Sequence, residues 1–356
     1  MIEFHPVVYK RKDFQYGDAI RRYTKLFGVE WNTSKLIYMC EFDPIDATEV
    51  TSDIVRIEGG QIPANIINMA MKNQAIIVFN FIEFIDHNMA ACNAELMLHG
   101  IPRGAVRFIT MKDKPSYFSN FWLTYAIQIK NSNTVSEINQ NVRLKKFVCL
   151  NRIPRHNRRY VASEILNRKI DADFYLSYQV TWPWKNNGDR HSSQPDWVDI
   201  IDSTLLDART PIIVDDLSLL AMNVHSNVST QFYTDAYWNL VTETECLSYV
   251  TVMTEKTFKP IANLQPFVIA GGHHTLFNLK KMGFQTFGNY IDESYDNILN
   301  DGLRLQAVMD LVTEMASWSH KKHVSLIKKI SPILKHNHTV FNSADSVQQR
   351  LIKIIS

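Results

Sequence analysis

A strand, loop, helix, strand pattern runs through three neighbouring segments: Tyr237-Trp-Asn-Leu-Val-Thr-Glu-Thr-Glu-Cys246, Thr254-Glu-Lys-Thr-Phe-Lys-Pro-Ile-Ala262 and Gln265-Pro-Phe-Val-Ile-Ala-Gly-Gly272. In the middle segment, Phe258, Ile261 and Ala262 recur at the i, i+3, i+4 spacing of a helix. Thr254 is a suitable N-cap, and Glu255 in the first turn suits the helix dipole. The three segments therefore predict two strands joined by a helix.

The second of these strands is bounded on both sides by residues that interrupt regular structure. Pro266 cannot continue the helix, the apolar run 267–270 indicates a buried strand, and Gly271-Gly272 ends it. If the two strands are parallel, the polar loop at Glu243 and Thr244, the helix start and the glycines share the carboxyl edge of one sheet. Open α/β sheets bind ligands at that edge, and glycines let a ligand approach the backbone. We therefore expect a ligand site there.

The same blocks resemble a known family. Val241-Thr-Glu-Thr244, Thr254-Glu-Lys-Thr-Phe-Lys-Pro-Ile261 and Pro266-Phe-Val-Ile269 are similar to the donor half of GT-B glycosyltransferases. The similarity is greatest to the fucosyltransferase- and exostosin-like group, which includes uncharacterised phage and bacterial members, and it covers roughly residues 145–300. The resemblance implies an α/β fold with two Rossmann-like lobes and a helical C-terminal tail.

The activity implied by this resemblance is metal-independent transfer of a sugar from a nucleotide sugar to a hydroxyl acceptor, without a cofactor. In the family, the glutamate that matches Glu255 accepts hydrogen bonds from the ribose hydroxyls. The lysine that matches Lys256, or backbone N–H groups near it, neutralises phosphate. The ordinary alternative is that Glu255 and Lys256 form an exposed ion pair of little consequence.

A cluster of arginines follows the first strand of the second half, in the run Asn151-Arg-Ile-Pro-Arg-His-Asn-Arg-Arg159. A strand-to-helix loop at a helix N-terminus is a natural phosphate site, and arginine forks match phosphate oxygens. The alternatives are a solvated helix start or a patch for a nucleic-acid backbone. The full set of expected donor-binding residues is Arg152, Arg155, Arg158, Glu243, Thr244, Thr254, Glu255, Lys256, Gly271 and Gly272.

An inverting transfer needs a carboxylate or histidine near the acceptor hydroxyl as its general base. We expect this base in the first half of the chain, which is the acceptor side. The predicted strand 75–82 continues into Glu83, Asp86 and His87, which are the candidates. Glu41 and Asp43, after an earlier strand, come next.

Three other polar groups are weaker candidates. Asp171-Ala-Asp173 resembles a metal-binding D-x-D sequence, but it lies before a predicted strand, where aspartates make turns, so we expect no metal there. Adjacent His273 and His274 do not face one way on a helix, which argues against a metal site. Asp215-Asp216 is an acidic pair at a strand end.

Length and composition favour two globular domains. The chain has 356 residues, of which 46% are hydrophobic, 11% aromatic and 21% charged, with a net charge of +2. We expect an acceptor-side domain at 1–143, a nucleotide-sugar domain at 144–300 and C-terminal helices at 301–356. The near-neutral charge means that any basic surface is local.

The cellular location expected from the sequence is the cytoplasm. The start Met1-Ile-Glu-Phe-His5 is not typical of a signal peptide, and no apolar run is long enough to span a membrane. Cys40, Cys92, Cys149 and Cys246 form no C-x-x-C motif, which favours free thiols over a disulfide framework or zinc site.

Three alternative functions remain open. The acceptor could be a hydroxymethylated base in DNA, as for phage DNA-modifying glycosyltransferases, with the arginine run and the aromatic loop around Trp182-Pro-Trp184 contacting nucleic acid. The protein could instead be a non-catalytic nucleotide-binding module. A nucleotide-dependent oxidoreductase is disfavoured, because no G-x-G-x-x-G follows a predicted strand.

Overall fold

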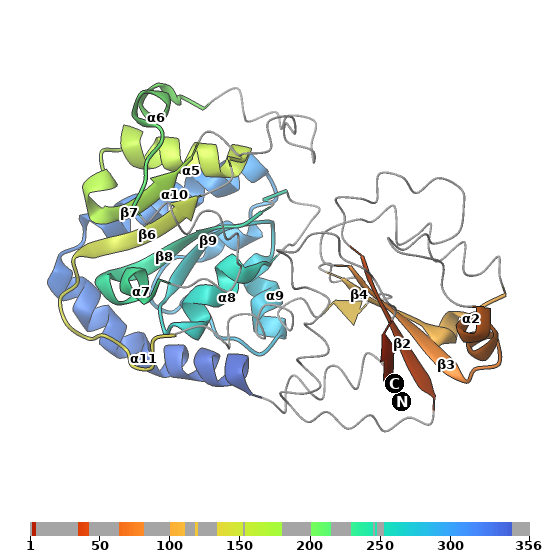
Figure 1. Cartoon of the computed structure of the whole chain (residues 1–356). Helices are drawn as coiled ribbons and strands as arrows, with labels where there is room; N and C mark the ends of the chain where they lie inside the picture. Colours follow the sequence, from red (N-terminus) through yellow and green to blue (C-terminus); the bar gives the residue numbers. More distant parts are fainter. Residues whose placement is uncertain are drawn as a thin grey trace. The chain divides into compact units, whose positions relative to one another are not determined.

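The structure is a computed structural model, and the residues that it describes are 2–4, 35–42, 64–81, 100–110, 118–119, 134–151, 154–179, 201–214, 229–244, 246–247 and 253–343. The chain divides into two compact units (Figure 1). The first unit contains Met1–Ile127 together with Ser343–Ser356, and the second contains Gln128–Asn342. The helices of the described part include none that is long and apolar enough to cross a membrane.

The first unit contains a parallel five-stranded sheet with the strand order β1-β2-β3-β4-β5. Ala75, Ile76 and Ile77 at the start of β3 are buried, as are Ile66 and Ala70 of the helix α2 that packs against it. The elements are β1 (Ile2–Phe4), β2 (Leu36–Phe42), α2 (Ala64–Met71), β3 (Ala75–Phe81), η3 (Arg103–Ala105), β4 (Val106–Thr110) and β5 (Phe118–Ser119).

The second unit contains a parallel four-stranded sheet with the strand order β7-β6-β8-β9. Its strands are β6 (Lys145–Asn151), β7 (Phe174–Tyr178), β8 (Ala236–Thr242) and β9 (Phe267–Ala270). Nearly every residue of β8 and β9 is buried, as expected for parallel strands covered on both faces. Trp238, Phe267 and Phe287 pack edge to face in its core.

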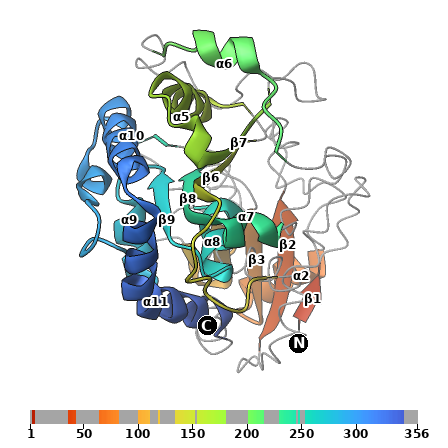
Figure 2. The same ribbon diagram turned by 90° about the vertical axis from the view of Figure 1, so that its left-hand side faces the viewer.

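Helices cover both faces of this sheet (Figures 1 and 2). Helices α5 and α10 contact each other on one face, α7 and α8 cover the other, and α11 packs against α8. Right-handed crossovers that run in opposite directions across a sheet put their helices on opposite faces. The elements are α5 (His156–Asn167), η4 (Asp171–Asp173), α6 (Thr204–Arg209), α7 (Thr230–Asp235), α8 (Glu255–Ala262), α9 (Thr275–Lys281), η7 (Ser294–Asn297), α10 (Asp301–Ser317) and α11 (His320–Asn342).

The expected α/β class with parallel sheets is confirmed, and the predicted strand–helix–strand unit at 237–272 is present as β8, α8 and β9. Thr254 is the N-cap of α8, because its hydroxyl accepts a hydrogen bond from the Lys256 N–H. One predicted strand is wrong. The run Pro211-Ile-Ile-Val-Asp-Asp216 predicts a short strand, but its described residues 211–214 form none, and Ile212 makes only an isolated antiparallel bridge to Tyr178. Asp215 and Asp216 lie outside the described residues.

The unit boundary lies earlier than residue 143, because the segment before β6 is bound to the second unit. The Val135 N–H donates to Asn263 Oδ1 at 3.0 Å, and the Arg143 N–H donates to the Tyr237 hydroxyl at 3.0 Å. Helices α10 and α11 also belong to the second unit rather than to a separate tail. Asn337 of α11, for example, exchanges two hydrogen bonds with the backbone of Gln285.

Candidate functional site

The order of strands in the second unit reverses between β6 and β8. From β6 the chain crosses to β7 on one side, and it later passes through β8 to β9 on the other side. The segments that follow β6 and β8 therefore leave the sheet in opposite directions at its carboxyl edge. In open α/β sheets this reversal marks the crevice in which ligands bind.

Hydrogen bonds hold the strand ends and helix starts together at this point. The Thr242 hydroxyl at the end of β8 donates to Asn151 Oδ1 at the end of β6. Asn157, in the first turn of α5, donates from Nδ2 to the Glu243 carbonyl oxygen at 2.8 Å. All three side chains of this network, Asn151, Asn157 and Thr242, are buried. The start of α5 is thus fixed against the end of β8.

Glu243 joins the end of β8 to the start of α8. Its carboxylate is fully buried, and each oxygen accepts two hydrogen bonds. Oε1 accepts from the Thr254 N–H at 2.9 Å and from the Thr257 hydroxyl at 2.6 Å, while Oε2 accepts from the Thr254 hydroxyl at 2.6 Å and from the Thr244 N–H at 3.2 Å. A buried carboxylate is tolerated only with such partners.

This arrangement differs from the expected contact between Glu243 and the donor. The carboxylate has no exposed surface to offer a ligand, and its acceptor positions are used inside the protein. Glu243 is therefore a positioning residue that fixes the N-terminus of α8. Thr244 lies beside it, partly buried, with its hydroxyl 3.4 Å from Lys256 Nζ.

Lys256 brings a positive charge to the end of β8. Its Nζ donates to Glu255 Oε1 at 2.7 Å and to the Thr254 hydroxyl at 3.1 Å, besides its contact with Thr244. The Lys256 side chain is 26% exposed and the Glu255 side chain 9% exposed. The pair is therefore partly desolvated, and it is not the exposed ion pair that we considered as an alternative.

A second lysine faces the same glutamate from one turn further along α8. Burial lowers the pKa of Lys259, while the charge of Glu255 acts in the opposite direction and that of Lys256 lowers it further. Helix α8 thus presents a carboxylate flanked by two ammonium groups along one side of its first two turns.

Two of the three expected arginines lie at the start of α5. Arg155 is its N-cap residue and is half-buried, whereas Arg158 in the first turn is only 3% exposed. Arg152 lies outside the described residues. Arg159 points away from the strand ends, since it makes an ion pair at 2.6 Å with Asp207 of α6. Of the arginines whose side chains are described, Arg155 is thus the most accessible one at the carboxyl edge.

The Cys149 thiol, two residues before the end of β6, is unreactive. Burial raises the pKa of Cys149 to about 12, against smaller opposite effects of Asn151 and Arg158. Cys149 and Cys246 are both buried free cysteines, as the sequence predicted for the cysteines in general. The side chains of Cys40 and Cys92 lie outside the described part.

The glycines after β9 are closely packed. A Cβ on Gly271 would lie 3.1 Å from both Ile269 Cγ2 and Thr275 Oγ1, so a larger residue would require these two side chains to shift. The next helix, α9, offers no free N-terminus, because the Asp296 carboxylate accepts from the Leu276 and Phe277 N–H groups at 2.9 Å and 3.0 Å.

The two histidines after these glycines stack on each other, with ring centroids 3.6 Å apart. Burial lowers the pKa of His273, and the neighbouring His274 and Arg304 lower it further. In the described part of the chain, no group of three or more His, Cys, Asp or Glu side chains is arranged to hold a metal ion.

Asp171 and Asp173 lie in η4, at the amino edge of the sheet. Asp173 pairs with Lys146 at 3.2 Å, and Asp171 pairs with Arg209 at 2.9 Å. They are thus at the opposite edge from the candidate site, as the sequence indicated. The candidates for the general base, Glu83, Asp86 and His87, lie outside the described residues, as does Asp43, and of Glu41 only the backbone is described.

Sequence reasoning missed a buried arginine that connects the loops of this edge. Arg304 of α10 donates to the carbonyl oxygens of Cys246, Gly271, Ile298 and Leu299 and pairs with Asp301. It is 2% exposed. The only signal in the sequence was an arginine between apolar positions of an amphipathic helix.

No protein-family model matches the sequence, and no curated protein matches it. Among solved structures, the chain is similar to a "putative UDP-N-acetylglucosamine 2-epimerase" from Listeria monocytogenes, at 10% identity and a TM-score of 0.37. That match covers 95% of this chain and 80% of the other. A TM-score of this size does not show a common fold, so the proposals below rest on the site itself.

Proposed function

We propose that the protein is a glycosyltransferase that moves a sugar from a nucleotide-sugar donor to a hydroxyl acceptor. The observation that carries this proposal is the position of Glu255 and Lys256. They occupy the first turn of α8, at the carboxyl edge and beside the strand reversal between β6 and β8. This is where an open α/β sheet accepts a nucleotide.

The chemistry of these residues suits a nucleoside diphosphate. Lys256 Nζ and the half-buried Arg155 supply positive charge for phosphate oxygens. A carboxylate at Glu255 can accept hydrogen bonds from a pair of ribose hydroxyls once Lys256 turns toward the phosphates. The donor would therefore exchange the ion pair between Glu255 and Lys256 for contacts of both side chains with the ligand.

The proposed role of the cations is to stabilise the diphosphate as it leaves. Negative charge grows on the leaving oxygen when the glycosidic bond to the diphosphate breaks, and fixed positive groups stabilise the transition state more than the ground state. Glu243 and Arg304 contribute indirectly, because they hold the α8 start and the loops after β8 and β9 in place. Proton removal from the acceptor is assigned to Glu83, Asp86 or His87, as the sequence suggested.

The test is a thermal-shift screen of the common nucleoside diphosphates and their sugar conjugates, each with and without a chelator. A ligand that binds only the folded protein increases the free energy of unfolding, by about 2.7 kcal/mol when its concentration is a hundred times Kd. This gain raises the melting temperature. We expect stabilisation by one nucleoside diphosphate and by its sugar conjugates, unchanged by chelator.

A shift that disappears with chelator and returns with manganese would contradict the metal-independent mechanism. The absence of any shift would contradict the donor site. A non-catalytic nucleotide-binding module is distinguished by the next step, because it would bind the sugar conjugate without ever releasing free nucleoside diphosphate in the presence of acceptors.

A further inference from the structure

The last long helix of the second unit has an unusual distribution of charge. Helix α11 spans 23 residues, and its sequence HKKHVSLIKKISPILKHNHTVFN contains five lysines but no aspartate or glutamate. The net charge of the chain is +2, so the chain without these five lysines has a net charge of −3. The near-neutral total therefore conceals a local concentration of positive charge.

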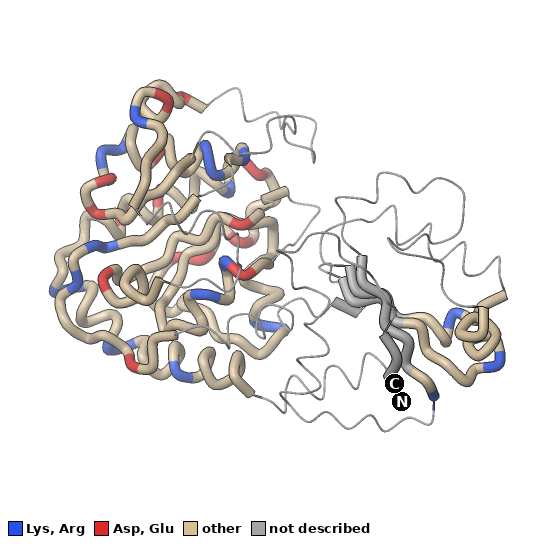
Figure 3. The backbone as a smooth tube through the Cα atoms, viewed as in Figure 1, with Lys and Arg blue, Asp and Glu red and all other residues tan. Residues whose placement is uncertain are grey.

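These lysines repeat with a period of seven residues. They form the pairs Lys321-Lys322 and Lys328-Lys329, and Lys335 follows one period later with His336 as its neighbour. Seven residues are close to two helical turns, so the pairs lie on nearly the same side of the helix, about 10.5 Å apart. The blue segments that recur along α11 in Figure 3 are these lysines.

The basic side of α11 faces solvent. All five lysines and His336 are exposed, whereas the apolar side of the helix is buried in the second unit. The buried residues of α11 are His323, Leu326, Ile327, Ile330, Ser331, Leu334, Asn337 and Phe341. The lysines therefore line the exposed side of a helix that is packed in the second unit, over a length of about 22 Å from Lys321 to His336.

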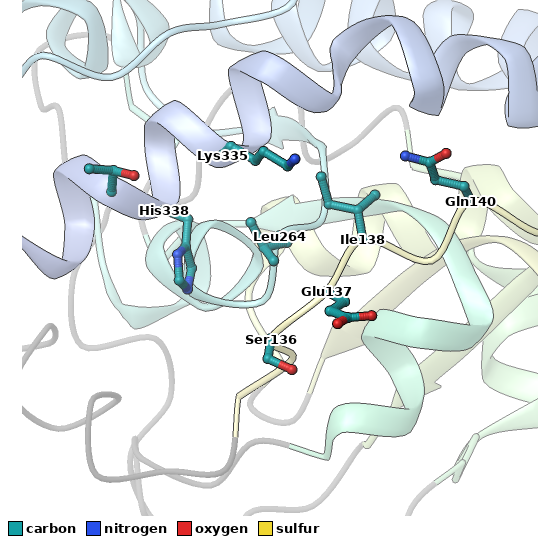
Figure 4. A pocket seen from close by; sticks show the side chains of 8 residues that line it. Ser136, Glu137, Ile138, Gln140, Leu264, Lys335 and His338 are labelled. Carbon is teal, nitrogen blue, oxygen red and sulfur yellow. The ribbon is translucent and has the colours of Figure 1, made fainter.

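In the described part of the chain, this stripe of lysines has contacts at both of its ends. Lys322 Nζ lies 3.5 Å from the centre of the Trp318 ring. At the other end of the stripe, Lys335 and His338 line a pocket of about 540 Å³, together with Glu137 from the segment before β6 (Figure 4). Glu137 is thus an acidic neighbour of the last lysine of the stripe, Lys335.

We infer that the α11 stripe, defined as Lys321, Lys322, Lys328, Lys329 and Lys335, is a binding surface for duplex DNA. Evenly spaced ammonium groups along one packed helix suit a partner whose charge also repeats, such as the phosphate backbone of a duplex. An anionic membrane would also attract lysines, but the apolar side chains that insert into lipid are buried here. Single strands prefer aromatic platforms, and none lies between the lysine pairs.

This inference is independent of the proposed function, because the stripe does not use the residues of the donor site. The DNA surface and the transferase activity can nevertheless coexist: if the acceptor is a base in DNA, the stripe would hold the polymer while the sugar is transferred to the base. The lysines carry no groups that read base sequence, so we expect sequence-independent binding.

The experiment is a fluorescence-anisotropy titration of the full chain with a labelled duplex of about 20 base pairs, two helical turns. Five phosphate contacts predict a slope of about −4.5 for log affinity against log salt. Affinity should then fall about 500-fold between about 50 and 200 mM salt. The double variant K328Q/K329Q should reduce the slope by about 1.8 and the loss over the same range to about 40-fold.

The matched control is the double variant K169Q/R209Q. It removes two exposed positive charges from the ends of α5 and α6, outside the stripe. It should leave the slope unchanged. Both lysines of the test variant are exposed, so it should fold normally, and circular dichroism checks this.

Three results would overturn the inference. The first is a slope of log affinity against log salt near zero for the wild type. The second is an equal reduction of that slope in the test and control variants. The third is stripe-dependent binding to phosphatidylserine vesicles that is stronger than binding to duplex DNA. Since neither variant touches the donor site, the nucleotide thermal shift should persist in both, and its absence would count against the proposed function only.

Discussion

Buried polar side chains hold the candidate site together from within. The Glu243 carboxylate fixes the start of α8, and the Asp296 carboxylate fixes the start of α9. The Arg304 guanidinium joins the loops after β8 and β9. None of the three reaches solvent appreciably, so each contributes position rather than contact with a ligand. Substituting them would therefore change stability and ligand affinity together.

His323 is a buried histidine whose titration should make stability depend on pH. Its ring stacks on Tyr237 at 4.9 Å, and Nε2 lies 3.1 Å from the Met315 carbonyl oxygen, which fixes Nε2 as the donor. Nδ1 is buried and has no hydrogen-bond partner. Burial lowers the pKa to about 4, and the positive charges of Lys146 and Lys322 act in the same direction.

The two pKa values of His323 determine whether stability rises or falls with pH. Between the ordinary value of 6.5 and the folded value of about 4, the unfolded chain binds a proton that the folded protein does not. The stabilising contribution is complete above 6.5 and is lost as the pH falls toward 4. The free energy of unfolding should therefore fall by about 1–2 kcal/mol more in the wild type than in H323Q, between about pH 7 and pH 5.

Urea unfolding at several pH values measures this difference. Glutamine at position 323 keeps a side-chain N–H for the Met315 carbonyl but does not titrate, so it separates the proton effect from the packing effect. Identical pH profiles for the two proteins would show that His323 is not the group responsible.

The start of α8 is the element on which the site depends most. Its N-cap Thr254 is buried and supplies a hydroxyl that both receives a hydrogen bond from the Lys256 N–H and donates one to Glu243. T254A removes both. We expect it to lower the free energy of unfolding by about 0.5–2 kcal/mol, the usual range for loss of an N-cap.

T254S is the matched control, because it keeps the hydroxyl and loses only a methyl group. Denaturant titration followed by circular dichroism compares the two variants with the wild type. If T254S lost as much stability as T254A, the hydroxyl would not be the cause and the methyl packing would be.

The elements that the sequence predicted well are those with strong local signals. The apolar run Phe174-Tyr-Leu-Ser-Tyr178 and the N-cap Thr254 predict strand β7 and helix α8 to within a residue or two. Strand β1 and helices α6 and α7 were missed. They have three to six residues each, too few for a periodic pattern to show.

The sequence predicted the position of the candidate site in the fold, but it did not predict the contacts within the site. The polar strand end and the helix start pointed correctly to the carboxyl edge. The role of Glu243 did not follow from the sequence, since its donors Thr254 and Thr257 meet it only after the loop has folded back. The same is true of Arg304, whose carbonyl partners come from three separate loops.

Across the second unit, charge and topology separate two surfaces with different proposed ligands. The carboxyl edge between β6 and β8 carries Lys256 and Arg155 beside strand ends, which suits one diphosphate. Helix α11 carries lysines in an exposed, regularly spaced stripe, which suits a long polyanion. Substitutions at one surface should leave binding at the other unchanged.

Isothermal titration calorimetry with the nucleoside diphosphate selected by the thermal-shift screen tests the central claim, that the first turn of α8 holds the donor. K256Q should weaken binding by about 10- to 100-fold, the equivalent of a lost charged hydrogen bond, and K256R should retain most of the affinity. K145Q removes an equal charge at the amino edge of the same sheet and should bind like the wild type. Equal affinities of K256Q and the wild type, or an equal loss in K145Q, would contradict the account.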